Sequence, residues 1–239
     1  MRLDVFLSDH QYYKSRARAV RAIGAGCVRV NGRVITKNSY DVNECDVLEC
    51  MPDPIPYVSR GGLKLEGALC RFGIDVRGKT CLDIGSSTGG FTHVLLERGA
   101  YSVTCVDVGH DQLDPLLKSD PRVVLHEDTD ARSFRPPVQY DFICMDVSFI
   151  SVTQLMDTVY ALLKPDGQTV ILIKPQFELG HQALNKKGIV KSTDAGRKKA
   201  DSIATYFCDR YGFRLQGMME SPIKGGDGNT EYCAYFHRK

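Results

Sequence analysis

Acidic residues on either side of a glycine-rich turn, in the middle of the sequence, could together hold a nucleoside. Asp83 lies in a short apolar run at 81–84, the turn follows at 85–90, and Asp107 closes a second apolar run about twenty residues further on. Glycine lets the backbone bend sharply and approach a ligand closely. The pattern predicts a strand, a glycine turn, a helix and a second strand, which form half of a nucleotide-binding doubly wound sheet.

The spacing of these glycines favours S-adenosylmethionine over a dinucleotide. Dinucleotide sites need G-x-G-x-x-G, whereas this turn reads G-x-x-x-G-G, so it does not predict a pyrophosphate cradle. A cationic adenosyl ligand suits the two carboxylates, with Asp107 accepting hydrogen bonds from the ribose hydroxyls. Glycines that only permit tight helix packing are the alternative. We expect the cofactor contacts from Asp83, Gly85, Ser86, Ser87, Thr88, Gly89, Gly90, Phe91, Asp107, Val108, Asp128, Asp130 and Asp146.

Further charged residues end strands that should be neighbours. Asp146 closes the apolar run 142–145, and Lys174 closes the run 170–173. A charge directly after a buried strand is costly unless it is paired or used. Each residue alone could be an ordinary loop residue, but parallel sheets bind ligands at this edge, so together they are candidates for chemistry. Lys64, near the start of a predicted helix, by itself indicates only a surface lysine.

The elements that must position these residues alternate along the chain. Strand-like runs recur at 122–126, 140–146, 168–174, 213–219 and 231–237, and helical patterns occupy 152–163 and 194–211. This alternation predicts an α/β fold, a mostly parallel sheet with helices on both faces. Only a glycine-rich stretch, 225–229, separates the last two strands, so they should pair antiparallel at one edge. Seven strands ending in a hairpin resemble the Rossmann-like class I methyltransferases.

The composition excludes several other classes of protein. The chain has 239 residues and nine cysteines, an odd number without a C-x-x-C pair, which indicates reduced thiols and argues against a zinc site. No apolar segment follows the N-terminus as in a signal peptide, and the longest apolar run, 170–173, is far shorter than the roughly twenty residues that a membrane span needs. We therefore expect a soluble, cytoplasmic protein with no metal and no membrane contact.

Residues 1–50 should form a small α+β module of their own. Leu3, Phe6 and Leu7 share one helical face, Ser15 can cap a second helix with Ala19, Val20 and Ile23 inward, and Asn31-Gly32 is a strong hairpin signal. No acidic residue occurs between His10 and Tyr40, although the total charge is only +2. This basic surface suits a nucleic-acid backbone, with a solvated face as the alternative. The basic residues are Lys14, Arg16, Arg18, Arg21, Arg29, Arg33 and Lys37.

The module resembles the S4-type RNA-binding domain, which implies structured RNA as its target. The residues that carry the resemblance are Ser15-Arg16, Ala19, Ile23, Gly26, Val28, Val30-Asn31-Gly32 and Asp46-Val47-Leu48. A stiff linker is expected at 51–58, since Pro52, Pro54 and Pro56 occur within it. The second domain would then span 59–239.

Motifs along the whole chain resemble the TlyA-type proteins, rRNA 2'-O-methyltransferases historically called haemolysins, whose catalytic domain is like that of the FtsJ (RrmJ) methyltransferases. These motifs are Ser59-Arg60-Gly61-Gly62-Leu63-Lys64-Leu65, Leu82-Asp83-Ile84-Gly85, Ser87-Thr88-Gly89-Gly90-Phe91-Thr92, Val106-Asp107-Val108-Gly109-His110, Asp146-Val147-Ser148-Phe149-Ile150-Ser151, Ile173-Lys174-Pro175-Gln176-Phe177-Glu178, Ser221-Pro222-Ile223-Lys224-Gly225, Gly228-Asn229 and Glu231-Tyr232. The resemblance implies a catalytic tetrad of Lys64, Asp146, Lys174 and Glu231. It also implies S-adenosylmethionine as methyl donor, a cytidine ribose as acceptor, and ribosomal RNA or ribosomal subunits as partners.

The sequence departs from the family pattern at few positions. Ser86 replaces the usual alanine, His93 stands where Asp is frequent, and 185–188 is more basic than the usual glycine-rich loop. These departures leave the tetrad intact and put loop closure and a direct role of position 93 in question. Arg60, in the first motif, joins the expected RNA-binding residues.

A ribose hydroxyl is a poor nucleophile near pH 7 and needs a base within reach. A lysine, whose ordinary pKa is about 10.4, can be that base only when it is neutral, and partial burial beside a second cation lowers its pKa. Our hypothesis assigns this role to Lys174, with Lys64 as the neighbouring charge. Asp146 and Glu231 would orient the two amines and offset the sulfonium charge of the donor.

Other functions stay open as alternatives. A pore-forming or non-catalytic RNA-binding protein would agree with the haemolysin name, but no segment is apolar enough to insert. An NAD-dependent oxidoreductase disagrees with the glycine spacing. A base methyltransferase would be expected to carry an Asn/Asp-Pro-Pro-aromatic motif where this chain has Asp146-Val147-Ser148-Phe149.

Overall fold

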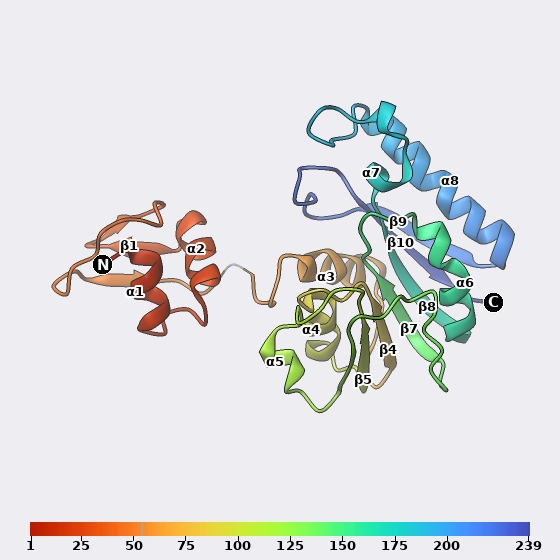
Figure 1. Cartoon of the computed structure of the whole chain (residues 1–239), viewed down its shortest axis with the longest axis horizontal. Coiled ribbons are helices and arrows are strands. Elements are labelled where there is room, and N and C mark those ends of the chain that lie inside the picture. The colour runs from red at the N-terminus through yellow and green to blue at the C-terminus, as the bar shows by residue number, and fades with distance from the viewer. Residues whose placement is uncertain (54) are drawn as a thin grey trace. The chain divides into compact units, whose positions relative to one another are not determined.

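The computed structural model describes residues 1–53 and 55–239, and these form two compact units, Met1–Pro56 and Tyr57–Lys239 (Figure 1). The boundary between the units falls within the stretch 51–58 that the sequence predicts to be a linker. Pro54, one of its prolines, lies outside the described residues.

The first unit consists of two helices and a small antiparallel sheet. Its helices are α1 (Leu3–Asp9) and α2 (Arg16–Gly24), and its strands are β1 (Val28–Val30), β2 (Arg33–Val34) and β3 (Leu48–Cys50), in the order β2-β1-β3. The Ser15 hydroxyl caps α2 by accepting a hydrogen bond from the Arg18 backbone N–H. Asn31 and Gly32 both have positive φ, 51° and 76°, which is the backbone of a tight hairpin turn. Both local predictions are confirmed.

The core of this unit is made by one side of each helix packed against β1. It contains Leu3, Leu7, Tyr13, Ala19, Ala22, Ile23, Val28, Val30 and Val42. The sequence analysis was wrong about Val20, which is only half-buried, and it missed Ala22. Residues 19, 22 and 23 share one face at helical spacing, whereas position 20 lies at the margin of that face.

A seven-stranded sheet organises the second unit. Its strands are β4 (Thr80–Ile84), β5 (Ser102–Val106), β6 (Val123–His126), β7 (Tyr140–Met145), β8 (Leu163–Ile173), β9 (Arg214–Glu220) and β10 (Tyr232–His237), in the order β6-β5-β4-β7-β8-β10-β9. The first five strands are parallel, and β10 pairs antiparallel with both β8 and β9. The expected parallel sheet with an antiparallel pair at one edge is confirmed.

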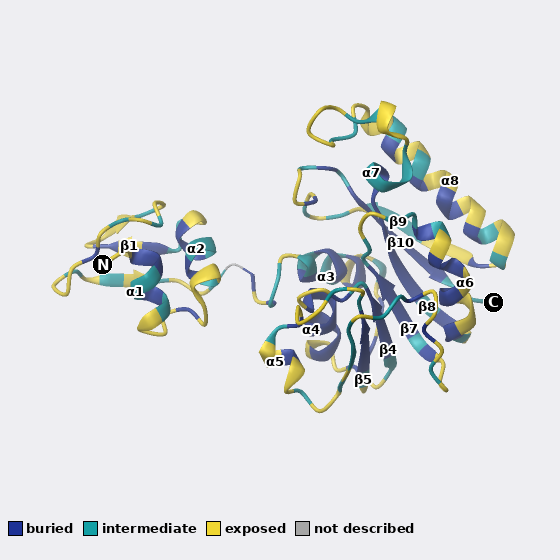
Figure 2. Ribbon diagram, viewed as in Figure 1, coloured by how far each residue is buried: buried dark blue, intermediate teal, exposed yellow. Residues whose placement is uncertain are grey.

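Helices lie on both faces of this sheet (Figure 1). They are α3 (Gly61–Phe72), α4 (Gly90–Glu97), α5 (Pro115–Lys118), α6 (Met156–Leu162), α7 (Pro175–Glu178) and α8 (Thr193–Tyr211), with short 3-10 turns η1 (Val152–Leu155) and η2 (His181–Ala183). Figure 2 shows the amphipathic character of α8, with buried residues toward the sheet and exposed residues on the outside. Apolar burial of this kind is what holds such layers together.

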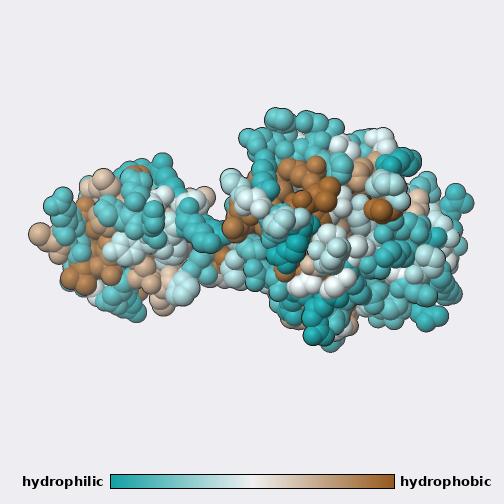
Figure 3. Space-filling model, turned by 90° about the horizontal axis from the view of Figure 1, so that it is seen from below, coloured by the Kyte–Doolittle hydropathy of each residue, from teal (hydrophilic) through white to brown (hydrophobic). Residues whose placement is uncertain are grey.

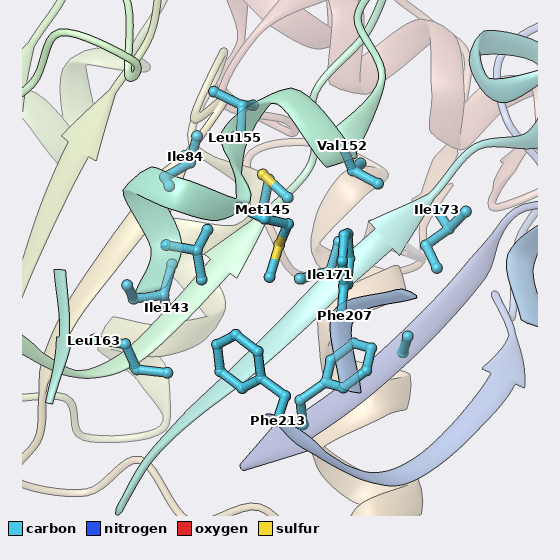
Figure 4. Packing of buried hydrophobic residues seen from close by; sticks show 14 of the residues in the cluster. Ile84, Ile143, Met145, Val152, Leu155, Leu163, Ile171, Ile173, Phe207 and Phe213 are labelled. Carbon is cyan, nitrogen blue, oxygen red and sulfur yellow. The ribbon is translucent and has the colours of Figure 1, made fainter. Parts of the chain in front are cut away.

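The main core lies between the sheet and the layer formed by α6 and α8. Alternate residues of the strands, such as Ile143, Met145 and Ile171, meet Phe207 from α8 and Phe213, which directly precedes β9 (Figure 4). The opposite face of the sheet contains the buried cysteines Cys81, Cys105, Cys144 and Cys233, which pack as small apolar side chains. The alternation explains why these strands are almost continuously apolar, since both faces are covered.

Strand β8 begins earlier than the sequence predicts. It starts at Leu163 rather than at residue 168, because Lys164 to Gly167 forms an irregular bulge between the pairs Tyr140↔Leu163 and Phe142↔Gln168. Pro165-Asp166-Gly167 has the composition of a turn, and Asp166 does adopt a positive φ of 59°. The turn-forming residues are therefore present, but inside a longer strand.

The surface of the protein is mainly hydrophilic, with hydrophobic residues gathered in places on the face that Figure 3 shows. Exposed large hydrophobic side chains include Val108, Val124, Val138 and Phe149. In the part of the chain that the structure describes, no helix combines the length and the apolar character that crossing a bilayer requires.

Candidate active site

The glycine turn connects β4 to α4 and is packed tightly against its neighbours. A Cβ on Gly85 would lie 2.5 Å from the carbonyl oxygen of Asp146, so only glycine allows β4 to approach the end of β7 this closely. A Cβ on Gly90 would lie 2.8 Å from the backbone nitrogen of Gly62, near the start of α3. The turn, the end of β7 and the start of α3 are thereby held together at the carboxyl edge of the sheet.

A cleft of about 710 Å³ opens at this edge. Of the expected cofactor residues, Gly85, Ser87, Asp107, Val108, Asp130 and Asp146 line it. The Asp107 carboxylate accepts hydrogen bonds from the backbone N–H groups of Ser87 and Gly109, each at 2.7 Å. Each carboxylate oxygen has a further lone pair, so Asp107 can still accept from a ligand hydroxyl.

Asp83 does not reach the cleft, which corrects the sequence-based prediction of a direct cofactor contact. Its side chain is fully buried and accepts hydrogen bonds from the backbone N–H and the hydroxyl of Thr92, at 3.0 and 2.7 Å. The thiols of Cys144 and Cys105 lie beside it on adjacent strands. Burial without a cationic partner raises the pKa of Asp83 to about 7, although the Thr92 hydrogen bonds oppose the shift. Asp83 therefore fixes the first turn of α4.

The other expected cofactor residues lie around the cleft without lining it. They are Ser86, Thr88, Gly89, Gly90, Phe91 and Asp128. The Ser86 hydroxyl is buried and makes no hydrogen bond within the described residues, whereas Asp128 is exposed and contacts His110 at 2.8 Å. The sequence analysis missed Gln112, Thr129, Ala131, Arg132 and Gln154, which the loops after β5, β6 and β7 bring to the cleft.

Four charged side chains from distant parts of the chain meet beside the cleft. The Asp146 Oδ1 atom lies 2.5 Å from the Lys174 Nζ atom, and its Oδ2 atom lies 3.5 Å from the Lys64 Nζ atom. The Lys64 amine also lies 2.7 Å from Glu231 Oε2. These contacts form a chain, Lys174 to Asp146 to Lys64 to Glu231, and Asp146 is the member that also lines the cleft.

The fold explains why these four residues converge. Asp146 directly follows β7 and Lys174 directly follows β8, its parallel neighbour. Glu231 directly precedes β10, whose first residue pairs with the last residue of β8. Lys64 lies in the first turn of α3, which the contact between Gly62 and Gly90 places over this edge.

The site keeps its two carboxylates next to two amines while excluding most water. Lys64 and Lys174 are 9% and 7% exposed, and Glu231 is 3% exposed. Burial alone would lower the pKa of Lys64, but the negative charges of Asp146 and Glu231 outweigh it and raise that pKa. The protonated form of Lys64 is therefore favoured between Asp146 and Glu231.

The segment after β7 shapes the mouth of the cleft. The Ser148 hydroxyl accepts a hydrogen bond of 2.9 Å from the Lys174 amine. Phe149 is 90% exposed with a φ of 66°, a strained conformation for a bulky residue, and its ring lies 5.1 Å from the ring of Phe177. Glu178 ties the segment to α7 by accepting hydrogen bonds from the Ser151 hydroxyl and the Val152 N–H. The Phe177 ring in turn lies 5.9 Å from the Lys174 amine, so it stands between the exposed Phe149 and the buried lysine.

The expected RNA-binding residues of the first unit divide into two groups. Arg16 pairs with Asp4, and Arg18 and Arg21 both pair with Asp53, so these arginines are partly neutralised by acids that lie outside the acid-free run. Arg2 and Arg16 hold the pKa of Asp4 at about 2 through hydrogen bonds and charge, against the opposing effect of burial. Lys14, Arg29, Arg33 and Lys37 have no ion pair among the described residues.

Arg60 and His93 both make hydrogen bonds that hold the chain near the start of α3. The Arg60 guanidinium donates a hydrogen bond of 3.0 Å to the Lys224 carbonyl, which ties the start of α3 to the loop before Glu231. His93 accepts a hydrogen bond of 3.1 Å from the Val58 N–H through Nδ1 and is almost fully buried. His93 therefore anchors the chain just before α3, and position 93 has a structural contact rather than a place in the cleft.

The described residues contain no group of three or more His, Cys, Asp or Glu side chains arranged to hold a metal ion. The donor set at the carboxyl edge combines two amines with two carboxylates, and these pair with each other.

Comparisons with known proteins agree with this geometry. The profile of the family described as FtsJ-like methyltransferase matches residues 57–238, and the profile of the S4 domain matches residues 1–48. A solved structure described as a hemolysin from Streptococcus thermophilus superimposes with a TM-score of 0.77 at 37% identity, covering 100% of this chain and 88% of that one.

Two curated relatives are similar over nearly their full length. Hemolysin A of Brachyspira hyodysenteriae is 42% identical over 240 residues, which cover 99% of each chain. The 16S/23S rRNA (cytidine-2'-O)-methyltransferase TlyA of Mycobacterium tuberculosis is 38% identical over 235 residues, covering 97% of this chain and 87% of that protein. The chain therefore belongs to the TlyA and hemolysin A family of FtsJ-like methyltransferases with an N-terminal S4 domain.

Proposed function

We propose that this methyltransferase transfers the methyl group of S-adenosylmethionine to the 2'-hydroxyl of a cytidine ribose in ribosomal RNA. The observation that carries the proposal is the position of Asp146, which lines the cleft and whose carboxylate pairs with Lys174 and Lys64. Donor and base can therefore act on the same atom. The name of the TlyA relative supports the choice of rRNA and of the cytidine 2'-oxygen.

The residues of the cleft fit an adenosyl donor. The volume of about 710 Å³ lies within the range of roughly 300 to 1,000 Å³ that is usual for small-molecule sites. Asp107 would accept hydrogen bonds from the ribose hydroxyls of the donor, and the backbone of Gly85 and Ser87 would face its amino-acid tail. When bound, S-adenosylmethionine supplies an electrophilic methyl group on a positively charged sulfur. The negative charge of Asp146 favours that charge in the cleft.

Lys174 is the proposed base. It must be neutral when it takes the proton of the ribose hydroxyl, and its contacts with Asp146 and Ser148 orient the nitrogen toward the mouth of the cleft. Lys64 keeps its proton, because Asp146 and Glu231 raise its pKa. Lys64 thus supplies positive charge next to the Asp146 carboxylate, which also contacts Lys174. Glu231 orients Lys64 in turn.

The surroundings of the site suit an RNA acceptor. RNA bases that leave their stack are commonly held on exposed aromatic side chains, and Phe149 offers such a ring at the mouth of the cleft, packed on Phe177. The S4 domain would bind the rRNA through its unpaired basic residues, Lys14, Arg29, Arg33 and Lys37. Arg60 would contribute next to the catalytic edge. We place this activity in the cytoplasm, where ribosomal subunits are found.

Substitution of the proposed base tests the function. Lys174→Ala should lower methyl transfer to ribosomal subunits by at least about 10³-fold, while the affinity for S-adenosylmethionine changes little. Methyl transfer is measured with radiolabelled donor, and binding is measured by calorimetry. Lys164→Ala is the matched control, because Lys164 pairs with Asp141 at the other end of the sheet. Near-normal turnover of Lys174→Ala would refute the assignment.

A further inference from the structure

A second group of basic residues lies on the catalytic unit, outside the S4 domain. Between Leu179 and Thr193 the chain has no acidic residue and contains Lys186, Lys187 and Lys191. All three side chains are exposed, and none forms an ion pair with any residue that the structure describes. The basic character of 185–188 is evident in the sequence, and the proposed function gives this segment no role.

This segment has a defined shape. An isolated bridge joins Leu184 to Val190, and the Asn185 side chain accepts hydrogen bonds from the backbone N–H groups of Lys187 and Ile189, at 2.8 and 3.0 Å. Gly188 completes the turn with a φ of 73°. We call residues 184–190 the basic hairpin. Its tip presents Lys186 and Lys187 to solvent.

Asn229 fastens the basic hairpin to the catalytic edge. This residue is 1% exposed, accepts a hydrogen bond of 2.9 Å from the Val190 N–H and donates one of 3.0 Å to the Gly188 carbonyl. Glu231, which holds Lys64, follows only two residues later in the sequence. The loop of the basic hairpin and the loop before β10 also lie next to each other in Figure 1.

The N-terminal half of α8 adds to the same surface. A Cβ on Gly196 would lie 3.5 Å from Pro175, the residue after Lys174, and 3.8 Å from Val190. Helix α8 therefore packs against both the catalytic edge and the basic hairpin, and Lys198 and Lys199 follow two and three residues after Gly196. Positive charge thus extends outward from the catalytic edge on this side.

We propose that the basic hairpin, with Lys191 and Lys198, binds the phosphate backbone of the RNA strand that presents its ribose to Lys174. The proposal rests on the RNA acceptor of the proposed function. A ribose can reach Lys174 only if its strand lies across this edge, and flanking phosphates then pass over the neighbouring surface. Lysines recognise phosphates as point charges, so the contact positions the strand and adds little sequence preference.

Charge reversal at the tip tests the proposal in the full-length protein. The double variant Lys186→Glu with Lys187→Glu should raise the KM for ribosomal subunits from cells lacking this protein by about tenfold, with kcat within about twofold. The dependence of log affinity on log salt concentration, measured without donor, should become shallower by about 1.4, because about 0.7 is lost for each single-stranded phosphate contact. The donor affinity should not change.

The matched control is Arg210→Glu with Arg214→Glu. This pair makes the same change of charge on exposed residues at the end of α8 and the start of β9, and β9 starts at the edge of the sheet opposite the site. It should leave KM and the salt dependence unaltered. Equal losses in both double variants, or no loss at the basic hairpin, would overturn the proposal.

Two further measurements keep the result specific. The neutral pair Lys186→Gln with Lys187→Gln should show the same change at a smaller size, and it replaces the first variant if charge reversal lowers the melting temperature. Loss of binding to phosphatidylglycerol vesicles, with subunit binding unchanged, would assign the basic hairpin to membranes and contradict us. If wild-type protein binds subunits without methylating them, the proposed function fails, whereas the binding comparison still tests the basic hairpin.

Discussion

Asp83 and Asp146 have contrasting surroundings, although they come from neighbouring parallel strands. Asp83 belongs to β4, and Asp146 directly follows β7. Asp146 lies at the edge, lines the cleft and contacts two lysine amines. Asp83 lies one residue before the end of β4 on the face toward α4, fully buried, with Thr92 and two thiols as neighbours. Asp83 lies beside Cys144, two residues before Asp146, so both carboxyl groups belong to the same face of the sheet, and their depth along the strands separates the buried group from the one at the cleft.

The difference shows how the same carboxyl group acquires two functions. A buried carboxylate without a cation is costly, so burial raises the pKa of Asp83 to about 7, and the protonated form is favoured in the folded protein below that pH. At the edge, paired amines stabilise negative charge, which a sulfonium donor can then use. The following predictions change one side of the comparison at a time.

The largest effect is expected from Asp146→Asn. The amide cannot pair with both amines, so methyl transfer should fall by about 10²- to 10⁴-fold, as for the loss of an acid–base group. Donor affinity should weaken as well, because the residue lines the cleft. Single-turnover kinetics and donor calorimetry measure the two effects separately. A variant that keeps more than about half of the wild-type rate would contradict the shared role of Asp146.

Lys64→Met should destabilise the fold rather than only the reaction. It leaves Glu231, 3% exposed, without its 2.7 Å partner, and removing one member of a buried pair costs about 3 to 5 kcal/mol. Urea denaturation measures the loss. The double variant Lys64→Met with Glu231→Gln should recover much of the stability but not the activity. No recovery in the double variant would show that the pair does not act as a unit.

Asp83→Asn should change how stability depends on pH. Because the folded pKa of about 7 lies above the unfolded value, the wild-type fold is favoured most below about pH 4 and loses up to about 4 kcal/mol as the pH rises to about 7. The variant should lack this loss. Denaturation at pH 4, 5.5, 7 and 8 measures the difference between the two proteins, and an unchanged pH profile would disprove the buried acid.

Asp141 provides a control of opposite sign for that experiment. Burial raises its pKa, but hydrogen bonds from Lys164 and Thr80 outweigh burial and lower the pKa to about 2. Its contribution to stability is therefore present above about pH 4 and is lost as the pH falls toward 2. Asp141→Asn should lower stability at neutral pH and leave the slope between pH 4 and 7 in place.

The smallest effect is expected from Ser148→Ala. The hydroxyl shares the Lys174 amine with Asp146, so its removal loosens the orientation of the amine without removing charge. We expect a roughly tenfold decrease in kcat with an unchanged KM for donor, which corresponds to about one hydrogen bond. Ser148→Thr keeps the hydroxyl and should restore most of the rate. An equal loss in both variants would indicate disturbed packing rather than a lost hydrogen bond.

The sequence predicts the architecture of the site better than its details. Asp146 and Lys174 follow strands whose apolar pattern is clear, so periodicity places them at one edge. Lys64 is different, because its helix is placed by packing against α4 and β10, including the contact of Gly62 with Gly90, which no local pattern reveals. Only the resemblance to a family suggests Lys64 and Glu231. Their catalytic roles and the domain boundaries at 50 and 58 stay predictions.

Where local sequence patterns did not predict the contacts of a residue, residues distant in the sequence determine those contacts. The acid-free run suggests a uniformly basic surface, but Asp4 and Asp53 lie outside it and fold back onto three of its arginines. Asp83 precedes the glycines as a ligand residue would, yet its depth along β4 keeps it away from the cleft. Cleft residues such as Gln112 and Gln154 come from loops, whose conformation depends on long-range packing.

The close approach of Gly62 and Gly90 also fixes the spacing between helices α3 and α4. Since neither position has space for one more carbon atom, helices α3 and α4 cannot slide past each other without separating. The distance from the backbone of Lys64 to the glycine turn is consequently set by main-chain contacts. Side-chain motion can move the Lys64 amine, but the spacing of the two helix backbones stays the same.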